Sequence, residues 1–243
     1  MNVGELTQAV KDYLHIGASH DAADMVVIDR LILQGLNHAR LWAERANDFA
    51  LAEVHGVVSV SPANGGSLSN VMVGSSVVSI KSILSAYVET PSGSNLHYPL
   101  TVRPRKTYVG MAQRSNMLSA GGRYRGDWSP SSEGCGGPTE LLTFGNSVFL
   151  EPATSTAVNV SIDGYRWLEP YTGPANTDFL TTYGSDWMQW FTICHVNRRV
   201  EVYVPRQEGT MSPPTDERDE AWLSLVQWDD FMHEEAREHN LGS

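Results

Sequence analysis

The sequence predicts an α+β protein in which N- and C-terminal helices form a bundle, with a large antiparallel β-rich insertion between them. Apolar residues recur at helical spacing in residues 1–52 and again in residues 175–243. Residues 53–174 are instead rich in β-branched residues that alternate with polar ones. We therefore expect 1–52 and 175–243 to form one discontinuous helical domain. A length of 243 residues accommodates this domain together with the insertion.

Two helices are expected in the first fifty residues. Asn2 and Glu5 have the spacing of a capping box, and Leu6 and Val10 then recur at helical spacing. Asp21 can cap a second, longer helix. Its apolar stripe consists of Ile28, Ile32, Leu36, Ala39, Ala43, Ala46 and Phe49, and off this stripe lie the polar residues Arg30, Gln34, Arg40 and Glu44. The second helix is therefore expected to pack on one side only.

The insertion contains two sets of strand-like segments. The first set contains the turn-rich cluster 61–67 and is marked by Val54, Val57, Val58, Val60, Val71, Val73, Val77, Val78, Ile80, Ile83 and Val88. The second set is marked by Val148, Leu150, Val158, Val160 and Ile162. Both sets predict short antiparallel strands, each half-buried.

Charge is distributed unevenly along the chain, whose formal net charge is −11. Residues 1–55 contain four basic and eight acidic residues, and residues 205–243 contain three basic and ten acidic residues. Residues 103–125, in contrast, contain no acid and six cations, which are Arg103, Arg105, Lys106, Arg114, Arg123 and Arg125. A protein this acidic repels nucleic acid at long range, which argues against a general DNA-binding protein.

The six cations lie in a long irregular stretch, residues 103–138, that is dense in glycine, serine and proline. A loop of this length inside a compact domain is usually functional or mobile. Its cations suit either a phosphate backbone or an acidic protein surface, and the acidic ends of neighbouring copies are one such surface. A solvated flexible loop is the alternative. We treat the six cations as candidate protein-interface residues.

Helical spacing returns after Pro174. A helix is expected to begin near Ser185, after an interruption at Gly184, and one face of this region contains Leu180, Tyr183, Trp187, Trp190 or Phe191, and Cys194. The alternation in 200–204 leaves open a short strand at its end. The last helix is expected from about Thr215, with the apolar stripe Ala221, Leu225, Trp228, Met232 and Ala236 and the acidic face Asp219, Glu220, Asp230, Glu234 and Glu238. Aromatic residues at helical spacing are typical of a core and also of obligate interfaces, so we add Trp222, Trp228 and Phe231 to the candidate interface.

No catalytic, cofactor-binding or metal-binding motif emerges from the sequence. His233 and His239 are six residues apart, which is not the helical spacing of a zinc site. Cys135 lies in a glycine-rich setting, but no spacing links it to a base, and two cysteines exclude a disulfide scaffold. The chain has no apolar run long enough to span a membrane and no apparent secretory signal. The two cysteines lie in very different contexts, so we expect reduced thiols in a cytosol.

Three segments give the chain a recognisable order: MNVGELTQAVKDYLHI, then LILQGLNHARLWAERANDF, then, after the β-rich middle, DWMQWFTICHVNRRVEVYVPRQEG. An acidic final helix follows them. In this order and residue character, notably around Asn37–Ala39 and Trp42–Arg45, the chain resembles the head-to-tail adaptor proteins of tailed bacteriophages. The resemblance covers roughly residues 1–50 and 178–240, and the insertion of about 120 residues departs from the smaller members of that family.

The resemblance implies a non-enzymatic structural virion protein that uses no cofactor and is made in the bacterial host cytoplasm. Twelve copies would form a ring beneath the dodecameric portal protein and join it to a tail or nozzle protein. The ring would surround an axial channel through which DNA passes without sequence-specific binding, and the C-terminal helix would dock on the portal. Two other classes stay open: a receptor- or glycan-binding virion module that uses the β insertion, and a hydrolase that uses Cys135 or the pair Glu133 and Glu140.

Overall fold

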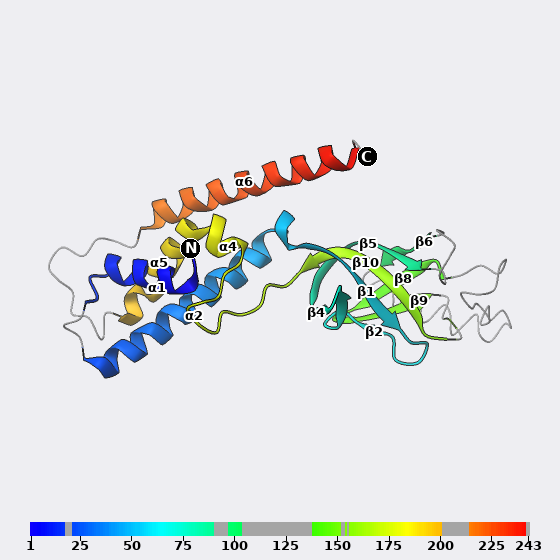
Figure 1. Ribbon diagram of the computed structural model, residues 1–243, viewed down its shortest axis with the longest axis horizontal. Helices are drawn as coiled ribbons and strands as arrows, with labels where there is room; N and C mark the ends of the chain where they lie inside the picture. The colour runs from blue at the N-terminus through cyan, green and yellow to red at the C-terminus, as the bar shows by residue number, and fades with distance from the viewer. Residues whose placement is uncertain are drawn as a thin grey trace. The chain divides into compact units, whose positions relative to one another are not determined.

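The computed structural model describes residues 1–17, 21–89, 97–103, 138–151, 154, 156–200 and 214–241. Within these residues, helices and two β-sheets confirm the α+β class. The chain divides into two compact units, which Figure 1 shows as a group of helices and a group of strands. The helical unit consists of Met1–Leu51 and Leu168–Ser243, and the β unit consists of Ala52–Trp167. None of the described helices is both long and apolar enough to cross a membrane.

Two capped helices begin the helical unit, as the sequence predicts. In α1 (Val3–Tyr13), the Glu5 N–H donates to Asn2 Oδ1 at 2.8 Å, and the Asn2 N–H donates to Glu5 Oε2 at 2.9 Å. Asp21 caps α2 (Ala22–Ala46) by accepting a hydrogen bond from the backbone of its first turn. The helix ends at Ala46, so Phe49 lies beyond it and not on its stripe. Phe49 is buried nevertheless.

Three further helices belong to the same unit: α4 (Phe179–Tyr183), α5 (Ser185–Val200) and α6 (Thr215–Leu241). Gly184 ends α4 immediately before α5 begins, which confirms the predicted interruption. The α5 helix contacts α1, α2, α4 and α6, and Figure 1 shows it among them. The residue that lets α2 approach α5 closely is Gly35, where a Cβ would lie 2.8 Å from Val196 Cγ1 and 2.9 Å from Thr192 Cγ2.

The expectation that α2 packs on one side only is wrong for two of its polar residues. Arg40 and Glu44 are 4% and 3% exposed. Arg40 Nη1 donates to Glu44 Oε2 at 2.6 Å and to the Leu168 carbonyl at 2.7 Å, and the Leu168 N–H donates to Glu44 Oε1. The chain returning from the β unit therefore covers this side of α2, and the ion pair satisfies the backbone that it buries.

The returning segment is fixed to both N-terminal helices by further hydrogen bonds. Asn37 Oδ1 accepts from the Tyr171 N–H at 2.8 Å, and Asn37 Nδ2 donates to the Tyr171 carbonyl at 2.9 Å. The first turn of α1 donates its Gly4 N–H to the Pro174 carbonyl at 2.9 Å. Residues 168–176 therefore bind α2 and α1 through their backbone, which joins the two ends of the chain in one unit.

Two sheets form the described part of the β unit. The six-stranded sheet has the order β4-β3-β1-β10-β5-β6 and consists of β1 (Glu53–Val60), β3 (Val71–Val73), β4 (Ser76–Val78), β5 (Ile80–Glu89), β6 (His97–Pro99) and β10 (Val158–Arg166). The four-stranded sheet has the order β2-β9-β8-β7 and consists of β2 (Gly66–Ser67), β7 (Thr101–Arg103), β8 (Glu140–Phe144) and β9 (Ser147–Glu151). The predicted strand positions in both sets are confirmed.

Two features of these strands differ from the prediction. The β7 and β8 strands pair in parallel, with Thr101 opposite Glu140, while the other pairs are antiparallel. The β10 strand is not half-buried, because Ser161 on its second face is also inaccessible to solvent. Ser161 is a small residue in a central strand, where it lies opposite Val57 on one side and Tyr87 on the other. Residues directly opposite one another share a face of the sheet, so these two larger residues flank Ser161.

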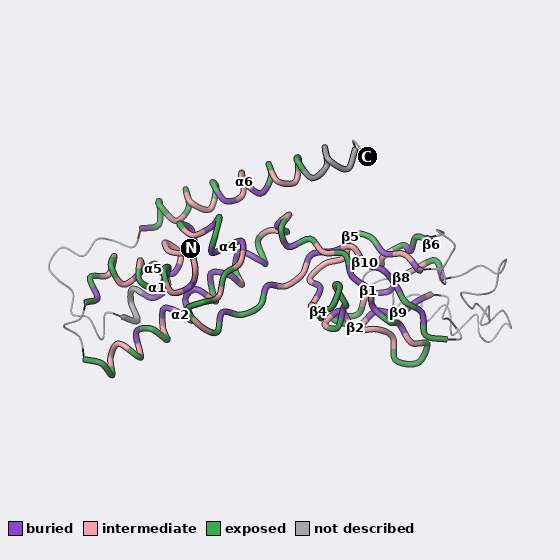
Figure 2. Tube along the Cα trace, in the orientation of Figure 1, coloured by how far each residue is buried: buried purple, intermediate pink, exposed green. Residues whose placement is uncertain are grey.

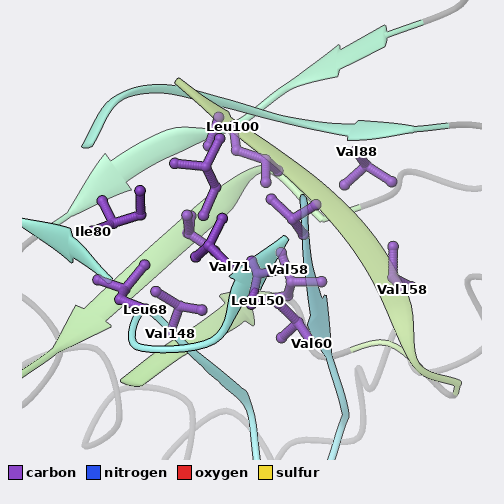
Figure 3. Packing of buried hydrophobic residues seen from close by; sticks show 14 residues of the cluster. Val58, Val60, Leu68, Val71, Ile80, Val88, Leu100, Val148, Leu150 and Val158 are labelled. Atoms are coloured by element: carbon purple, nitrogen blue, oxygen red, sulfur yellow. The ribbon is translucent and has the colours of Figure 1, made fainter. Parts of the chain in front are cut away.

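One hydrophobic core unites both sheets. From the six-stranded sheet it contains the inward-facing residues Val58, Val60, Val71, Ile80, Ala86, Val88, Val158, Val160 and Ile162. From the four-stranded sheet it contains Leu141, Val148 and Leu150. Figure 3 shows many of these side chains converging between the strands. All of these residues belong to Ala52–Trp167, so the β unit has a core of its own. Burying an aliphatic side chain of this size contributes about 1.5–3 kcal/mol.

Candidate functional site

Of the six predicted cations, the structure describes one. Arg103 ends β7, and its Nε lies 2.9 Å from Glu140 Oε1 on the neighbouring strand β8. The other five, Arg105, Lys106, Arg114, Arg123 and Arg125, lie outside the described residues, as do Cys135 and Glu133. Arg103 therefore has an acidic partner within the β unit, although residues 103–125 contain no acid.

Trp222 lies in an aromatic cluster that α6 forms with α2 and α5. Its ring centroid lies 4.8 Å from that of Trp42 and 5.1 Å from that of Trp187. Trp187 is buried, whereas Trp42 is 42% exposed at the edge of the cluster. Aromatic pairs at these distances contribute about 0.5–1.5 kcal/mol each beyond their burial. Trp222 thus attaches α6 to the rest of the helical unit.

The other two predicted aromatic residues lie in different surroundings. Trp228 stacks on Tyr183 of α4, with ring centroids 4.4 Å apart and planes inclined by 17°. Phe231 lies on the solvent side of α6 and is 54% exposed. Among the three aromatic candidates, Phe231 is the one whose side chain is open to a partner.

A buried carboxylate, Asp229, holds α6 against the end of α2. It is 1% exposed, and its two oxygens accept from the Ala50 N–H at 2.8 Å and from Asn47 Nδ2 at 3.0 Å. His233, one turn later, lies 3.5 Å from Asp229 Oδ2 and 3.1 Å from the Asp48 carbonyl. Burial raises the pKa of Asp229, although the Ala50 N–H, His233 and Asn47 each lower it. Sequence spacing did not identify Asp229 as a docking residue, because its hydrogen-bond partners are about 180 residues away in the chain.

The opposite face of α6 is acidic and carries two exposed apolar residues. Leu223 is 60% exposed and Phe231 is 54% exposed. Around them lie the exposed acids Asp216, Glu217, Asp219, Glu220, Asp230, Glu234 and Glu235. Figure 2 shows exposed positions recurring along α6 beside buried and intermediate ones. We call this surface, from Asp216 to Glu235, the outward face of α6, and it is the candidate interaction surface of the helical unit.

The β unit contains a polar cluster that the sequence did not reveal. On adjacent strands, Asp163 accepts hydrogen bonds from His55 Nδ1 at 2.7 Å and from Ser85 Oγ at 2.5 Å. Tyr87 stacks on the His55 ring at a centroid distance of 6.0 Å. Burial alone would raise the pKa of Asp163, but the Ser85 and His55 interactions outweigh it and lower this pKa. Only the strand register brings the three residues into one row, and the sequence does not state that register.

The described part of the chain contains no assembled site for a catalytic nucleophile or for a metal ion. Burial raises the pKa of the Cys194 thiol, which lies 3.6 Å from the Pro214 carbonyl, so the thiol is a weak nucleophile at neutral pH. The described residues hold no group of three or more His, Cys, Asp or Glu side chains suited to a metal ion. The rings of His38 and His195 lie close together, with Nδ1 atoms 3.2 Å apart, on α2 and α5.

A search of protein-family models and of curated proteins finds no match to this chain.

Proposed function

We propose that this protein is a head-to-tail adaptor of a tailed bacteriophage, a structural virion protein whose copies form a ring between the portal and the tail. The observation that supports this role is the construction of the helical unit from both ends of the chain. The middle of the chain leaves that unit as a separate β unit and then returns to it. This is the arrangement that the family resemblance leads us to expect.

The contacts within the helical unit fit a bundle with an inserted domain. The α5 helix contacts helices from both chain ends, and the segment returning from the β unit is hydrogen-bonded to α1 and α2. Ring-forming proteins need such a rigid frame, because each subunit must present the same two surfaces at a fixed angle. The β unit, with its separate core, is then free to vary in size.

The charge of the protein fits a channel that passes DNA. A net charge of −11 gives a surface that does not hold phosphates, whereas each cation–phosphate contact would add salt-dependent affinity. In the proposed assembly the ring has twelve copies, binds the portal on one side and a tail or nozzle protein on the other, and resides in the neck of the virion. DNA passes through the channel without sequence-specific binding.

Light scattering coupled to size-exclusion chromatography tests this proposal. The chain is run alone, with the portal protein of the same phage, and with its tail proteins. We expect one chain per portal subunit to co-elute with the portal. The variant Asp229→Ala, in which α6 loses the carboxylate that holds it against the end of α2, is compared with the wild type. We expect this variant to bind the portal more weakly. A chain that binds neither portal nor tail protein contradicts the adaptor role.

A further inference from the structure

The outward face of α6 combines two properties, a high density of acids and two exposed large apolar side chains. It has seven exposed acids, and between residues 215 and 235 the sequence has one basic residue, Arg218, whose Nη2 lies 2.7 Å from Asp219 Oδ1. It also exposes Leu223 and Phe231, which lie about 12 Å apart along the helix and about 80° apart around it. Both apolar side chains therefore belong to the same acidic surface.

The chain itself contains the complementary sequence. Residues 104–125 have five cations and no acid, and the apolar residues Tyr108, Val109, Met111, Met117, Leu118 and Tyr124 lie among them. A segment of this composition matches the outward face of α6 in both respects, because its cations suit the acids and its apolar side chains suit Leu223 and Phe231. We propose that the outward face of α6 binds residues 104–125 of a second copy of this chain.

Charge favours this contact over a symmetric one. A two-fold contact between two α6 helices would bring seven acids against seven acids, which costs free energy, most of all at low ionic strength. A contact between unlike surfaces is heterologous, and heterologous contacts repeat around a ring when the rotation closes. The inference rests on the proposed adaptor role and deepens it, because it names the surfaces that join neighbouring subunits.

A charge-swap experiment tests the contact directly. The first variant reverses three acids of the outward face, and the second reverses three cations of the segment: Glu220→Lys, Asp230→Lys and Glu234→Lys in one chain, and Arg105→Glu, Arg114→Glu and Arg123→Glu in the other. Each variant alone should associate at least about tenfold more weakly than the wild type, the effect of losing three exposed ion pairs. A mixture of the two should form heterodimers, because the unaltered outward face of the second variant meets the unaltered segment of the first.

The control separates the specific contact from a change in net charge. It reverses three exposed acids elsewhere, in the variant Asp12→Lys, Glu53→Lys and Glu169→Lys, and it should associate like the wild type. A further variant, Leu223→Ser with Phe231→Ser, removes the apolar part without altering charge and should also weaken association. Molar mass at low salt, from light scattering over a concentration series, is the readout, and circular dichroism verifies the fold of each variant.

Each outcome decides the proposal. It is overturned if the wild type stays monomeric at high concentration, if the α6 variant associates normally, or if the mixture does not recover. Docking of the segment within one copy gives monomers throughout and therefore also overturns it. A chain that is monomeric alone but forms a ring on the portal contradicts this contact and leaves the adaptor role standing. If the mixture of variants associates but the chain binds neither portal nor tail, the contact between copies is supported and the adaptor role is contradicted.

Discussion

Replacing Glu44 by Gln should destabilise the helical unit more than any surface substitution on α2. The two oxygens of Glu44 have separate partners: Oε2 accepts from Arg40 Nη1, and Oε1 accepts from the Leu168 N–H. Glutamine has the same shape but a single acceptor oxygen, so its NH₂ group must face one of these donors. The substitution also leaves the 4%-exposed Arg40 without a counter-charge.

The size of this loss follows from the burial of the pair. Breaking a buried ion pair by neutralising one partner costs about 3–5 kcal/mol. The remaining amide oxygen recovers about 1 kcal/mol through the one hydrogen bond that it can still accept. We therefore expect Glu44→Gln to lower the free energy of unfolding of the helical unit by about 2–4 kcal/mol, out of a total of about 5–15 kcal/mol for a domain.

Urea unfolding followed by tryptophan fluorescence measures this quantity for the helical unit. Five of the seven tryptophans, Trp42, Trp187, Trp190, Trp222 and Trp228, belong to that unit. The matched control is Glu169→Gln, one residue after Leu168 but exposed, which should change stability by less than about 0.5 kcal/mol. A loss below about 1 kcal/mol for Glu44→Gln would refute the conclusion that this pair fixes the returning segment.

Three other changes have defined outcomes. Gly35→Ala brings a Cβ against the stiff β-branched Thr192 and Val196, so it should lower stability by about 1 kcal/mol in urea unfolding despite the better helix propensity of alanine. Asp229→Ala removes two hydrogen bonds to a buried carboxylate and should lower the free energy of unfolding by about 2–3 kcal/mol. Amide hydrogen exchange should also become faster where α6 contacts the residues that follow α2. The lowered pKa of Asp163 stabilises the β unit above about pH 4, so acid unfolding should be steeper in the wild type than in Asp163→Asn, measured by circular dichroism.

Local signals in the sequence predicted where α1, α2 and α5 begin, although α2 ends at Ala46, before Phe49. Asn2 with Glu5, Asp21 and Gly184 act through the backbone within a few residues of themselves, so their roles follow from spacing alone. The strand positions follow similarly from alternation of side chains. These predictions succeed because the residues that interact lie close to one another in the sequence.

The errors have the opposite origin. Arg40 and Glu44 have the composition of an exposed helix face, and they are buried because the backbone of Leu168, more than 120 residues away, packs on them. In the sequence, Asp229 looks like any other acid of an acidic helix, and its role depends on the distant donors Ala50 and Asn47. No periodicity identifies which polar residues a distant segment covers, since that depends on the tertiary arrangement.

The same distinction separates the candidate interface residues. Trp222 and Phe231 belong to one helix and have the same chemical character, yet Trp222 packs against Trp42 and Trp187 while Phe231 faces solvent. Helical spacing indicates that the two residues point in different directions. It does not indicate which direction is the inside, and the position of α2 and α5 decides that.

A single buried acid therefore determines what the other acids of α6 can do. Asp229 fixes the rotation of the helix about its axis, because its two oxygens must meet Ala50 and Asn47. With that rotation set, Leu225 and Trp222 point inward, and Leu223 and Phe231 point outward among the acids. A rotated or detached α6 would mix the two faces and remove the continuous acidic surface. The proposed contact between copies thus depends on a residue that never reaches the interface, and Asp229→Ala should weaken association even though every outward acid remains in place.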